Sequence, residues 1–185
     1  MGAPSWRGPT PRTSYVSKLE WLNGLPFEDA KAEFMRCCGS TRWAVSMARA
    51  RPFRTEGSVY SEAGWLWSQT TQEDWREAFS HHPRIGDVNK LRERFKASGA
   101  WSEQEQKGIQ GAGQDVIEAL ADGNREYELR FGFIFLICAT GKSAQEILGH
   151  LRERLRNPPQ LELRVAAGEQ AQITRLRLEK LLTSP

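Results

Sequence analysis

The sequence predicts an all-α fold, a single-domain bundle of about seven to nine helices. Apolar residues recur at steps of three and four along most of the chain, and no set of alternating strands is visible. Three Ser/Thr-x-x-Glu sequences, typical of helix N-termini, stand before helical segments. The 185 residues are enough for one domain with a substantial core. We expect this domain to span residues 15–185, after a disordered lead at 1–14.

The first half of the chain predicts four helices, which begin after a turn at 23–26. In chain order they are 27–38, a short helix around Trp43 and Met47 that Pro52 stops, 58–69, and a helix running from the Thr70–Glu73 capping box to the residue before Pro83.

The second half predicts three further helices around an apolar segment. The Ser102–Glu105 capping box opens a long helix, which 122–124 is expected to end or bend. Residues 131–140 are apolar on all sides and form either a buried helix or a buried strand, since periodicity does not decide between the two. The Ser143–Glu146 box opens a helix to about Arg156, and a last helix follows the break at 157–159 and covers about 161–182.

The composition indicates a soluble globular protein and excludes several classes. The hydrophobic fraction is 39%, and the apolar run at 131–140 is too short to span a bilayer. Positive residues are interspersed with glutamates, without a basic stripe of stacking aromatics, so no nucleic-acid role is expected. The N-terminus has no apolar signal core, and three cysteines give no disulfide framework. We therefore expect a cytoplasmic protein.

His82 is the first candidate for chemistry. It is expected in the last turn of a helix, where the helix dipole favours a protonated imidazole, and imidazole titrates near neutral pH. The alternative is a histidine that only caps the helix. His81 and His82 are neighbours and cannot chelate one metal as helical residues four apart do. Because no His, Cys or carboxylate motif supplies other ligands, no metal site is expected.

Glu105 and Arg177 each have a structural and a functional interpretation. Glu105 stands where a capping-box acid belongs, but a helix N-terminus also offers amide donors to a bound anion. Arg177 shares the apolar stripe of Ile173 and Leu181, so it needs an anionic or carbonyl partner unless it extends to water. Arg175 lies on another apolar stripe, so this criterion separates the two arginines only weakly.

Three motifs together resemble a known family. They are His-Pro-Arg-Ile-Gly at 82–86, Ser-x-x-Glu-Gln at 102–106, and the segment 127–143. In this order they are similar to 2-oxo-4-hydroxy-4-carboxy-5-ureidoimidazoline (OHCU) decarboxylase, over roughly residues 15 to 182. The resemblance implies an all-helical protein, a homodimer without a cofactor, which decarboxylates this small molecule to (S)-allantoin in uric acid breakdown.

The resemblance also implies roles for individual residues. His82 corresponds to the catalytic histidine, Glu105 to the essential acid, and Arg177 to the arginine that holds the substrate. Arg175 and Arg130 remain alternatives for that arginine. The residues implied to line the substrate site are Pro83, Ser102, Glu105, Gln106, and the backbone of Phe135, Leu136, Ile137, Cys138 and Ala139.

The sequence leaves two alternative functions open. One is a hydrolase of the same pathway, acting on a ureide or on hydroxyisourate, although the sequence lacks the metal ligands or hydrolytic motif expected of it. The other is a non-catalytic helical interaction protein on the same scaffold. The joint presence of His82, Glu105 and Arg177 argues against that second alternative.

Overall fold

The computed structural model describes residues 16–82 and 103–183, with the backbone alone for residues 103–112. Within these ranges it contains eight helices and no strand, which confirms the predicted all-α fold. The helices are α1 (Lys18–Gly24), α2 (Phe27–Cys38), α3 (Thr41–Arg49), α4 (Glu56–Ser68), α5 (Gln72–Ser80), α7 (Glu103–Phe131), α8 (Ala144–Arg154) and α9 (Pro159–Thr183). The predicted lead at 1–14 lies outside the described residues.

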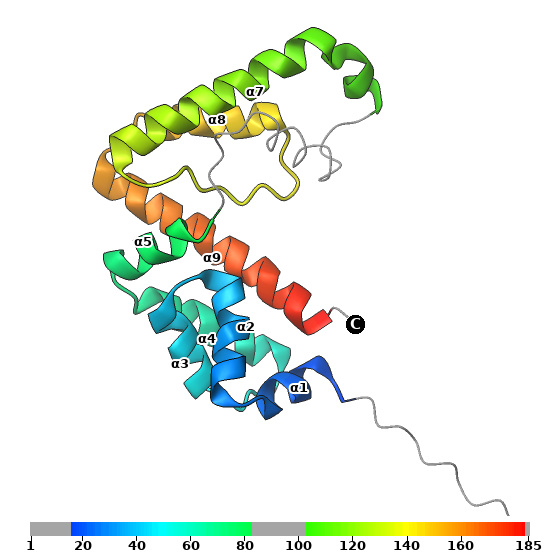
Figure 1. The fold of residues 1–185 in the computed structure, drawn as a ribbon, viewed down its shortest axis with the longest axis vertical. Helices are drawn as coiled ribbons and strands as arrows, with labels where there is room; N and C mark the ends of the chain where they lie inside the picture. The colour runs from blue at the N-terminus through cyan, green and yellow to red at the C-terminus, as the bar shows by residue number, and fades with distance from the viewer. Residues whose placement is uncertain (1–15, 83–102, 184–185) are drawn as a thin grey trace, which may run out of the picture.

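The long helix α9 connects two groups of helices. Figure 1 shows α1 to α5 gathered at one end, α7 and α8 side by side at the other, and α9 running between them. Helix α9 packs against α1, α2, α4, α5 and α7, whereas α8 packs mainly against α7. The last helix therefore contributes side chains to both groups.

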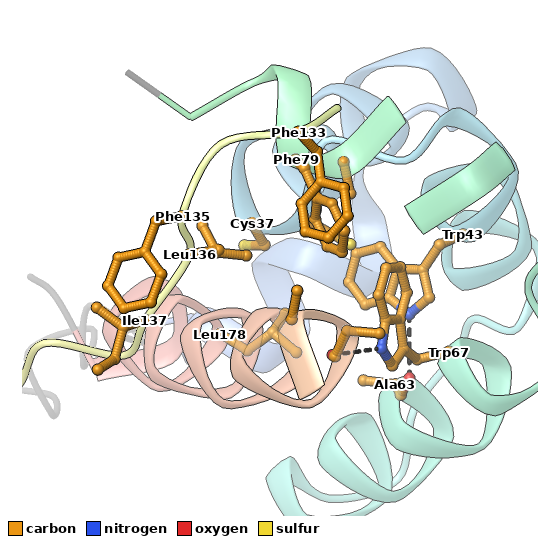
Figure 2. Packing of buried hydrophobic residues seen from close by; sticks show 14 of the residues in the cluster. Cys37, Trp43, Ala63, Trp67, Phe79, Phe133, Phe135, Leu136, Ile137 and Leu178 are labelled. Atoms are coloured by element: carbon orange, nitrogen blue, oxygen red, sulfur yellow. Dashed lines mark hydrogen bonds between the residues drawn. The ribbon is translucent and has the colours of Figure 1, made fainter. Parts of the chain in front are cut away.

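The core between α1–α5 and α9 is aromatic. Phe34 of α2 and Trp43 of α3 are fully buried, with their ring centroids 6.0 Å apart in an edge-to-face arrangement. The Trp43 indole N–H donates to the Ala63 carbonyl at 3.0 Å, and the Trp67 indole N–H donates to the Ala167 carbonyl of α9 at 3.0 Å (Figure 2). Each indole thus buries its ring while its polar atom keeps a partner.

Helix α1 was not among the predicted helices. Ser17 caps it, with the side chain accepting from the Glu20 amide and the Glu20 carboxylate accepting from the Ser17 amide. This is a capping box of the same kind as the three predicted from the sequence. With only seven residues, α1 is too short to show a clear apolar period.

The capping box predicted at Thr70–Glu73 is wrong by one residue. Thr71 is the N-cap of α5, and its partner is Asp74. The Thr70 hydroxyl instead donates to the Trp67 carbonyl at 2.5 Å. Thr70 lies two residues after α4, and because its hydroxyl is bonded back to that helix, Thr71 opens the next one.

The predicted end or bend at 122–124 is absent, since α7 continues through Gly123 to Phe131. A Cβ at Gly123 would lie 2.7 Å from the Leu151 side chain of α8. The buried Asn124 amide donates to the Leu120 carbonyl within the helix. Gly123 therefore serves the close approach of α8 rather than the end of α7.

Residues 132–140 form neither the helix nor the strand that the sequence left open. Gly132 leaves α7 with a φ of +74°, and the chain runs without a strand partner to Gly141, whose φ is +76°. Ser143 then caps α8 through the predicted box with Glu146. The apolar composition reflects the burial of this segment and not a regular secondary structure.

The helix boundaries near the break at 157–159 differ slightly from the prediction. Helix α8 ends at Arg154 rather than Arg156, and α9 begins at Pro159 rather than Leu161. Proline suits the first helical position because its ring fixes φ and it has no N–H to leave unpaired there.

Candidate active site

Side chains of α9 cover the C-terminal end of α2. The Arg177 guanidinium donates through Nη1 to the carbonyls of Arg36 at 3.4 Å and Cys37 at 3.2 Å. The buried Gln170 amide donates to the Cys38 carbonyl at 3.4 Å. The last carbonyls of a helix have no partner inside it, so these two side chains satisfy groups that α2 leaves open.

His82 lies just beyond α5, two residues after its last residue Ser80, and not inside its final turn as predicted. Its backbone N–H donates to the Phe79 carbonyl at 3.1 Å. The half-buried imidazole places Nε2 2.8 Å from Oε1 of Gln170. The histidine is thereby attached to the α9 side chain that also covers the end of α2.

The ends of α2 and α5 approach each other closely at Gly39. This residue follows α2 with a φ of +81°, a conformation that favours glycine. A Cβ there would lie 2.8 Å from the His81 Cβ, so any larger residue would push the two helix ends apart. The small residue therefore keeps His82 next to the C-terminal end of α2.

The structure separates the arginines that the sequence could not. Arg177 has the carbonyl partners that its place on an apolar stripe predicted. Arg175 is exposed, pairs with Glu179 at 2.7 Å and lies 3.9 Å from the centroid of the Tyr60 ring. Arg130 is exposed near the end of α7. Of the three arginines, only Arg177 binds carbonyls at the C-terminal end of α2, where Gln170, the partner of His82, also binds.

Residues 135–139 follow an extended path, with the first four side chains buried and that of Ala139 half-buried. Side chains from outside the segment bind its backbone. The Leu136 carbonyl accepts from Arg154 at 2.8 Å, the Cys138 amide donates to Glu169 at 2.7 Å, and the Cys138 carbonyl accepts from Lys142 at 2.8 Å. Since Glu169 precedes Gln170 on α9, neighbouring residues of one helix hold this segment and His82.

A buried polar network lies behind the same segment. The Arg154 guanidinium and the Glu162 carboxylate form an ion pair at 2.7 Å, with side chains 8% and 0% exposed. The Tyr127 hydroxyl and the Asn157 amide also donate to Glu162. Burial, followed by the bond to Glu162, raises the pKa of Tyr127 well above its ordinary value. The tyrosine therefore stays a neutral donor to the carboxylate.

The two cysteines at the end of α2 are poor nucleophiles. Burial raises the pKa of the Cys37 thiol to about 12 and that of Cys38 to about 11, although Arg177 acts in the opposite direction on both. A thiol attacks as its thiolate, which is scarce so far below these values. The site therefore offers the imidazole, rather than a thiolate, as its reactive group.

The remaining predicted residues lie in or next to the segment that is not described. Pro83 and Ser102 are outside the described residues, and so is the capping box of Ser102. Glu105 and Gln106 are placed by their backbone at the start of α7. In Figure 1 the start of α7 lies away from the C-terminal end of α5.

Gln170, Thr174 and Glu169 were not predicted as residues of the site. Gln170, Thr174 and Arg177 are spaced by four and three along α9 and therefore share one helix face. Both Gln170 and Thr174 are buried. Polar residues in register with a predicted core-facing arginine were a signal that could have identified them.

Outside the segments left undescribed, no group of three or more His, Cys, Asp or Glu side chains is arranged to hold a metal ion. None of the described helices combines the length and the apolar character needed to cross a membrane.

Comparison with known proteins identifies the family. Residues 23–179 match the family model for OHCU decarboxylase. The chain belongs to the OHCU decarboxylase family. The match includes the end of α5, the extended segment and the α9 residues described above, so the family assignment rests on the same part of the chain as the candidate site.

Individual relatives agree with this assignment. The chain is 33% identical over 159 residues to the uric acid degradation bifunctional protein of Arabidopsis thaliana, covering 86% of this chain and 49% of that protein. It is 27% identical to the uric acid degradation bifunctional protein of Bacillus sp. (strain TB-90), covering 90% of this chain and 32% of that protein. The chain thus spans half or less of the length of these relatives.

A solved structure agrees in fold over most of its length. A crystal structure of an OHCU decarboxylase in the presence of (S)-allantoin superposes with a TM-score of 0.67 and 36% sequence identity. The superposition covers 82% of this chain and 98% of that one. The helical architecture of this protein is therefore that of an OHCU decarboxylase.

Proposed function

We propose that this protein is a carbon–carbon lyase that decarboxylates OHCU to (S)-allantoin in uric acid degradation, without a cofactor. The observation that carries the proposal is the family match over residues 23–179, which includes His82 at the junction of α2, α5 and α9. The related OHCU decarboxylase crystallised in the presence of (S)-allantoin gives it further support.

The chemistry of the substrate is compatible with catalysis by protein groups, without a cofactor. The bond between the ring carbon and its carboxylate breaks, CO₂ leaves, and the electron pair stays on the ring. The imine delocalises that pair through the neighbouring carbon, which bears the ureido group. That neighbouring carbon then takes up a proton, while the hydroxyl-bearing carbon loses its hydroxyl proton and becomes the carbonyl carbon of allantoin. The tasks left to the protein are to orient the ring, to turn the carboxylate out of its plane, and to deliver the proton to one face.

His82 is the proposed proton donor or acceptor, acting on the ring hydroxyl or on the developing carbanion. Glu105 is the proposed group that fixes the orientation of the ring or of His82, and this role rests on the resemblance of 102–106 to the family motif. Arg177 is proposed to bind a substrate carbonyl or carboxylate. Its hydrogen bonds to the Arg36 and Cys37 carbonyls use Nη1, and a guanidinium has five N–H donors, so donors remain for a ligand.

Pro83, Ser102, Gln106 and residues 135–139 are proposed to line the substrate site. The side chains of Phe135, Leu136, Ile137 and Cys138 are buried. A bound substrate would therefore meet the backbone of this segment rather than its side chains. Arg154, Glu169 and Lys142 hold that backbone in a fixed path, which suits the recognition of a planar ring.

The decisive experiment replaces His82 with asparagine. With freshly generated OHCU, we expect His82→Asn to lower the rate of CO₂ release by about 10²- to 10⁴-fold, the usual contribution of a general acid–base group. We also expect the allantoin to lose its handedness, measured by circular dichroism. Normal turnover with full enantiomeric excess would show that the histidine role is wrong. His150→Asn, a change at an exposed histidine of α8, is the matched control.

The same assay separates the alternatives. Release of ureide or hydroxyisourate hydrolysis products without CO₂ would identify a hydrolase, and allantoin binding without turnover would identify a non-catalytic protein.

We further propose a homodimer in the cytoplasm. The three cysteines are free and buried, as suits a reducing compartment. Light scattering of the purified protein tests the dimer, and a monomeric mass would exclude it.

A further inference from the structure

We propose that Gln170 is a positioning residue that fixes the tautomer of His82, with the proton on Nε2, so that Nδ1 is the nitrogen that gains and loses the catalytic proton. The catalytic part of this inference rests on the proposed decarboxylase function. The part about the tautomer depends only on the contacts of Gln170 with Cys38, His82 and Thr174.

The direction of each hydrogen bond follows from its acceptors. A backbone carbonyl can only accept, so the bond of 3.4 Å between Gln170 and the Cys38 carbonyl requires the amide nitrogen there. The same nitrogen donates to the Thr174 hydroxyl at 3.1 Å. The amide oxygen must then face His82, whose Nε2 is 2.8 Å away. An amide oxygen cannot donate, so the hydrogen between them belongs to Nε2 of the imidazole.

Burial makes this arrangement difficult to reverse. Gln170 is 0% exposed and Thr174 is 5% exposed, so water does not replace a lost partner. Turning the amide over would place its oxygen against the Cys38 carbonyl oxygen, with no hydrogen between them. A buried polar group left unsatisfied in this way is strongly unfavourable. The amide is therefore held in one orientation from both ends.

The fixed tautomer has a consequence for proton transfer. With Nε2–H directed at Gln170, the neutral imidazole carries its lone pair on Nδ1, and the imidazolium carries its second proton there. In the proposed reaction that proton moves from Nδ1 to the ring carbon that bears the ureido group after CO₂ has left, and the imidazole returns to the neutral Nε2–H form. An amide partner holds the ring without adding a negative charge, unlike a carboxylate.

Other titratable and charged groups surround this cluster. From α2 they are the thiols of Cys37 and Cys38, from α9 the Arg177 guanidinium, and from α5 the side chains of Glu77 and His81. None of them bonds to the Gln170 amide among the described contacts. A change at Gln170 therefore alters the Nε2 partner of His82 without changing any of these charges.

The first test is a spectroscopic measurement on the full chain without substrate. Nitrogen-15 NMR of protein labelled at histidine distinguishes the two neutral tautomers, and the His82 signals are those missing from His82→Asn. We expect Nε2–H in the wild type and in Gln170→Glu, and a mixture of tautomers in Gln170→Leu. A wild-type His82 that carries its proton on Nδ1 alone would overturn the proposal.

The second test is kinetic. We expect Gln170→Leu to lower kcat by about 10- to 100-fold with KM changed by less than roughly twofold, as for other groups that orient a reacting side chain. Gln170→Glu keeps the acceptor and adds a negative charge that favours the imidazolium, so it should recover part of kcat and move the alkaline limb of the pH profile to higher pH. Wild-type kcat and pH profile in Gln170→Leu would contradict the positioning role.

The matched control is Gln172→Leu together with Gln172→Glu, at an exposed glutamine of the same helix. These variants should keep the wild-type kcat and pH profile. The two tests also separate this inference from the proposed function. A wild type with Nε2–H but no decarboxylation would refute the function alone, whereas active protein with His82 protonated on Nδ1 alone would refute the role of Gln170 alone.

Discussion

The end of the molecule formed by α1–α5 and the end formed by α7 and α8 are held together by different interactions. At the first end, aromatic and aliphatic side chains pack around Phe34, Trp43 and Trp67. At the second, the buried Arg154–Glu162 pair and its hydrogen bonds fix the path of an extended backbone segment. Helix α9 takes part in both, through Ala167 in the first and Glu162 in the second.

The difference shows which part of the fold depends on close packing of apolar side chains and which part depends on hydrogen bonds with a fixed donor and acceptor. Apolar contacts have no preferred donor or acceptor, so a core of this kind tolerates exchanges that conserve volume. Hydrogen bonds to the Leu136 carbonyl or to Glu162 fail when one partner is removed, because the other stays buried. The substrate-lining segment proposed above belongs to the second, less tolerant kind.

The largest expected effect comes from removing the charge at the centre of the polar network. Arg154→Met replaces the arginine with an unbranched apolar side chain. The change leaves Glu162 without its cation and the Leu136 carbonyl without its donor. Breaking a buried pair in this way costs about 3–5 kcal/mol of the free energy of unfolding. Urea denaturation followed by circular dichroism measures the loss.

Two further variants make this a comparison of the two regions. Met47→Leu in the apolar core conserves volume and should cost less than about 1.5 kcal/mol. Arg152→Met, at an exposed arginine on α8, should change little. If Arg154→Met were no more destabilising than Met47→Leu, the contrast between the two regions would not hold.

A smaller effect is expected where α7 and α8 meet. Gly123→Ala adds a methyl group 2.7 Å from the buried Leu151 side chain, an overpacking that costs about 1–3 kcal/mol. The better helix propensity of alanine offsets about 1 kcal/mol of this. Gly149→Ala on α8 meets no atom within 4 Å and should instead raise the thermal midpoint. Equal shifts of the two midpoints would show that α8 does not approach α7 so closely.

The smallest effect concerns pH at the end of α2. The Cys37 pKa is about 12 in the folded chain against an ordinary value of 9.0, because burial disfavours the thiolate. The unfolded chain releases this proton first, so the stability contribution is complete below about pH 9 and is lost as the pH rises toward 12. Cys37→Ala should therefore lose less stability than the wild type between neutral pH and about pH 11. Parallel losses in urea titrations would rule out a burial effect at Cys37.

Local patterns in the sequence predicted several helix starts and ends. The bounds of α2 match the predicted 27–38, and the Ser143 cap of α8 is where its box placed it. These features depend on residues within a few positions of one another. The short α1 and the shift from Thr70 to Thr71 show the limit of such patterns, since several polar residues near a helix start compete to cap it.

Long-range hydrogen bonds account for what the sequence could not decide. Residues 132–140 have neither helix nor strand because their backbone bonds go to Arg154, Glu169 and Lys142, of which the first two lie more than a dozen residues away. Likewise, His82 was predicted from its place before Pro83, but its partner Gln170 lies 88 positions along the chain. A single sequence shows which residues share one face of a helix. It does not show which other element of the fold packs against that face.

The adjacency of Glu169 and Gln170 on α9 also bears on partially folded states. Neighbouring pairs such as α2–α3 and α7–α8 join segments that are close in sequence, and short loops of this kind close readily. Docking of α9 must instead bridge most of the chain, from Cys38 to Gln170. An intermediate with α9 undocked would lack the supports of His82, of the α2 carbonyls and of the Cys138 amide at the same time. Docking of α9 would therefore supply these three supports together, and a chain in which α9 is undocked would lack all of them.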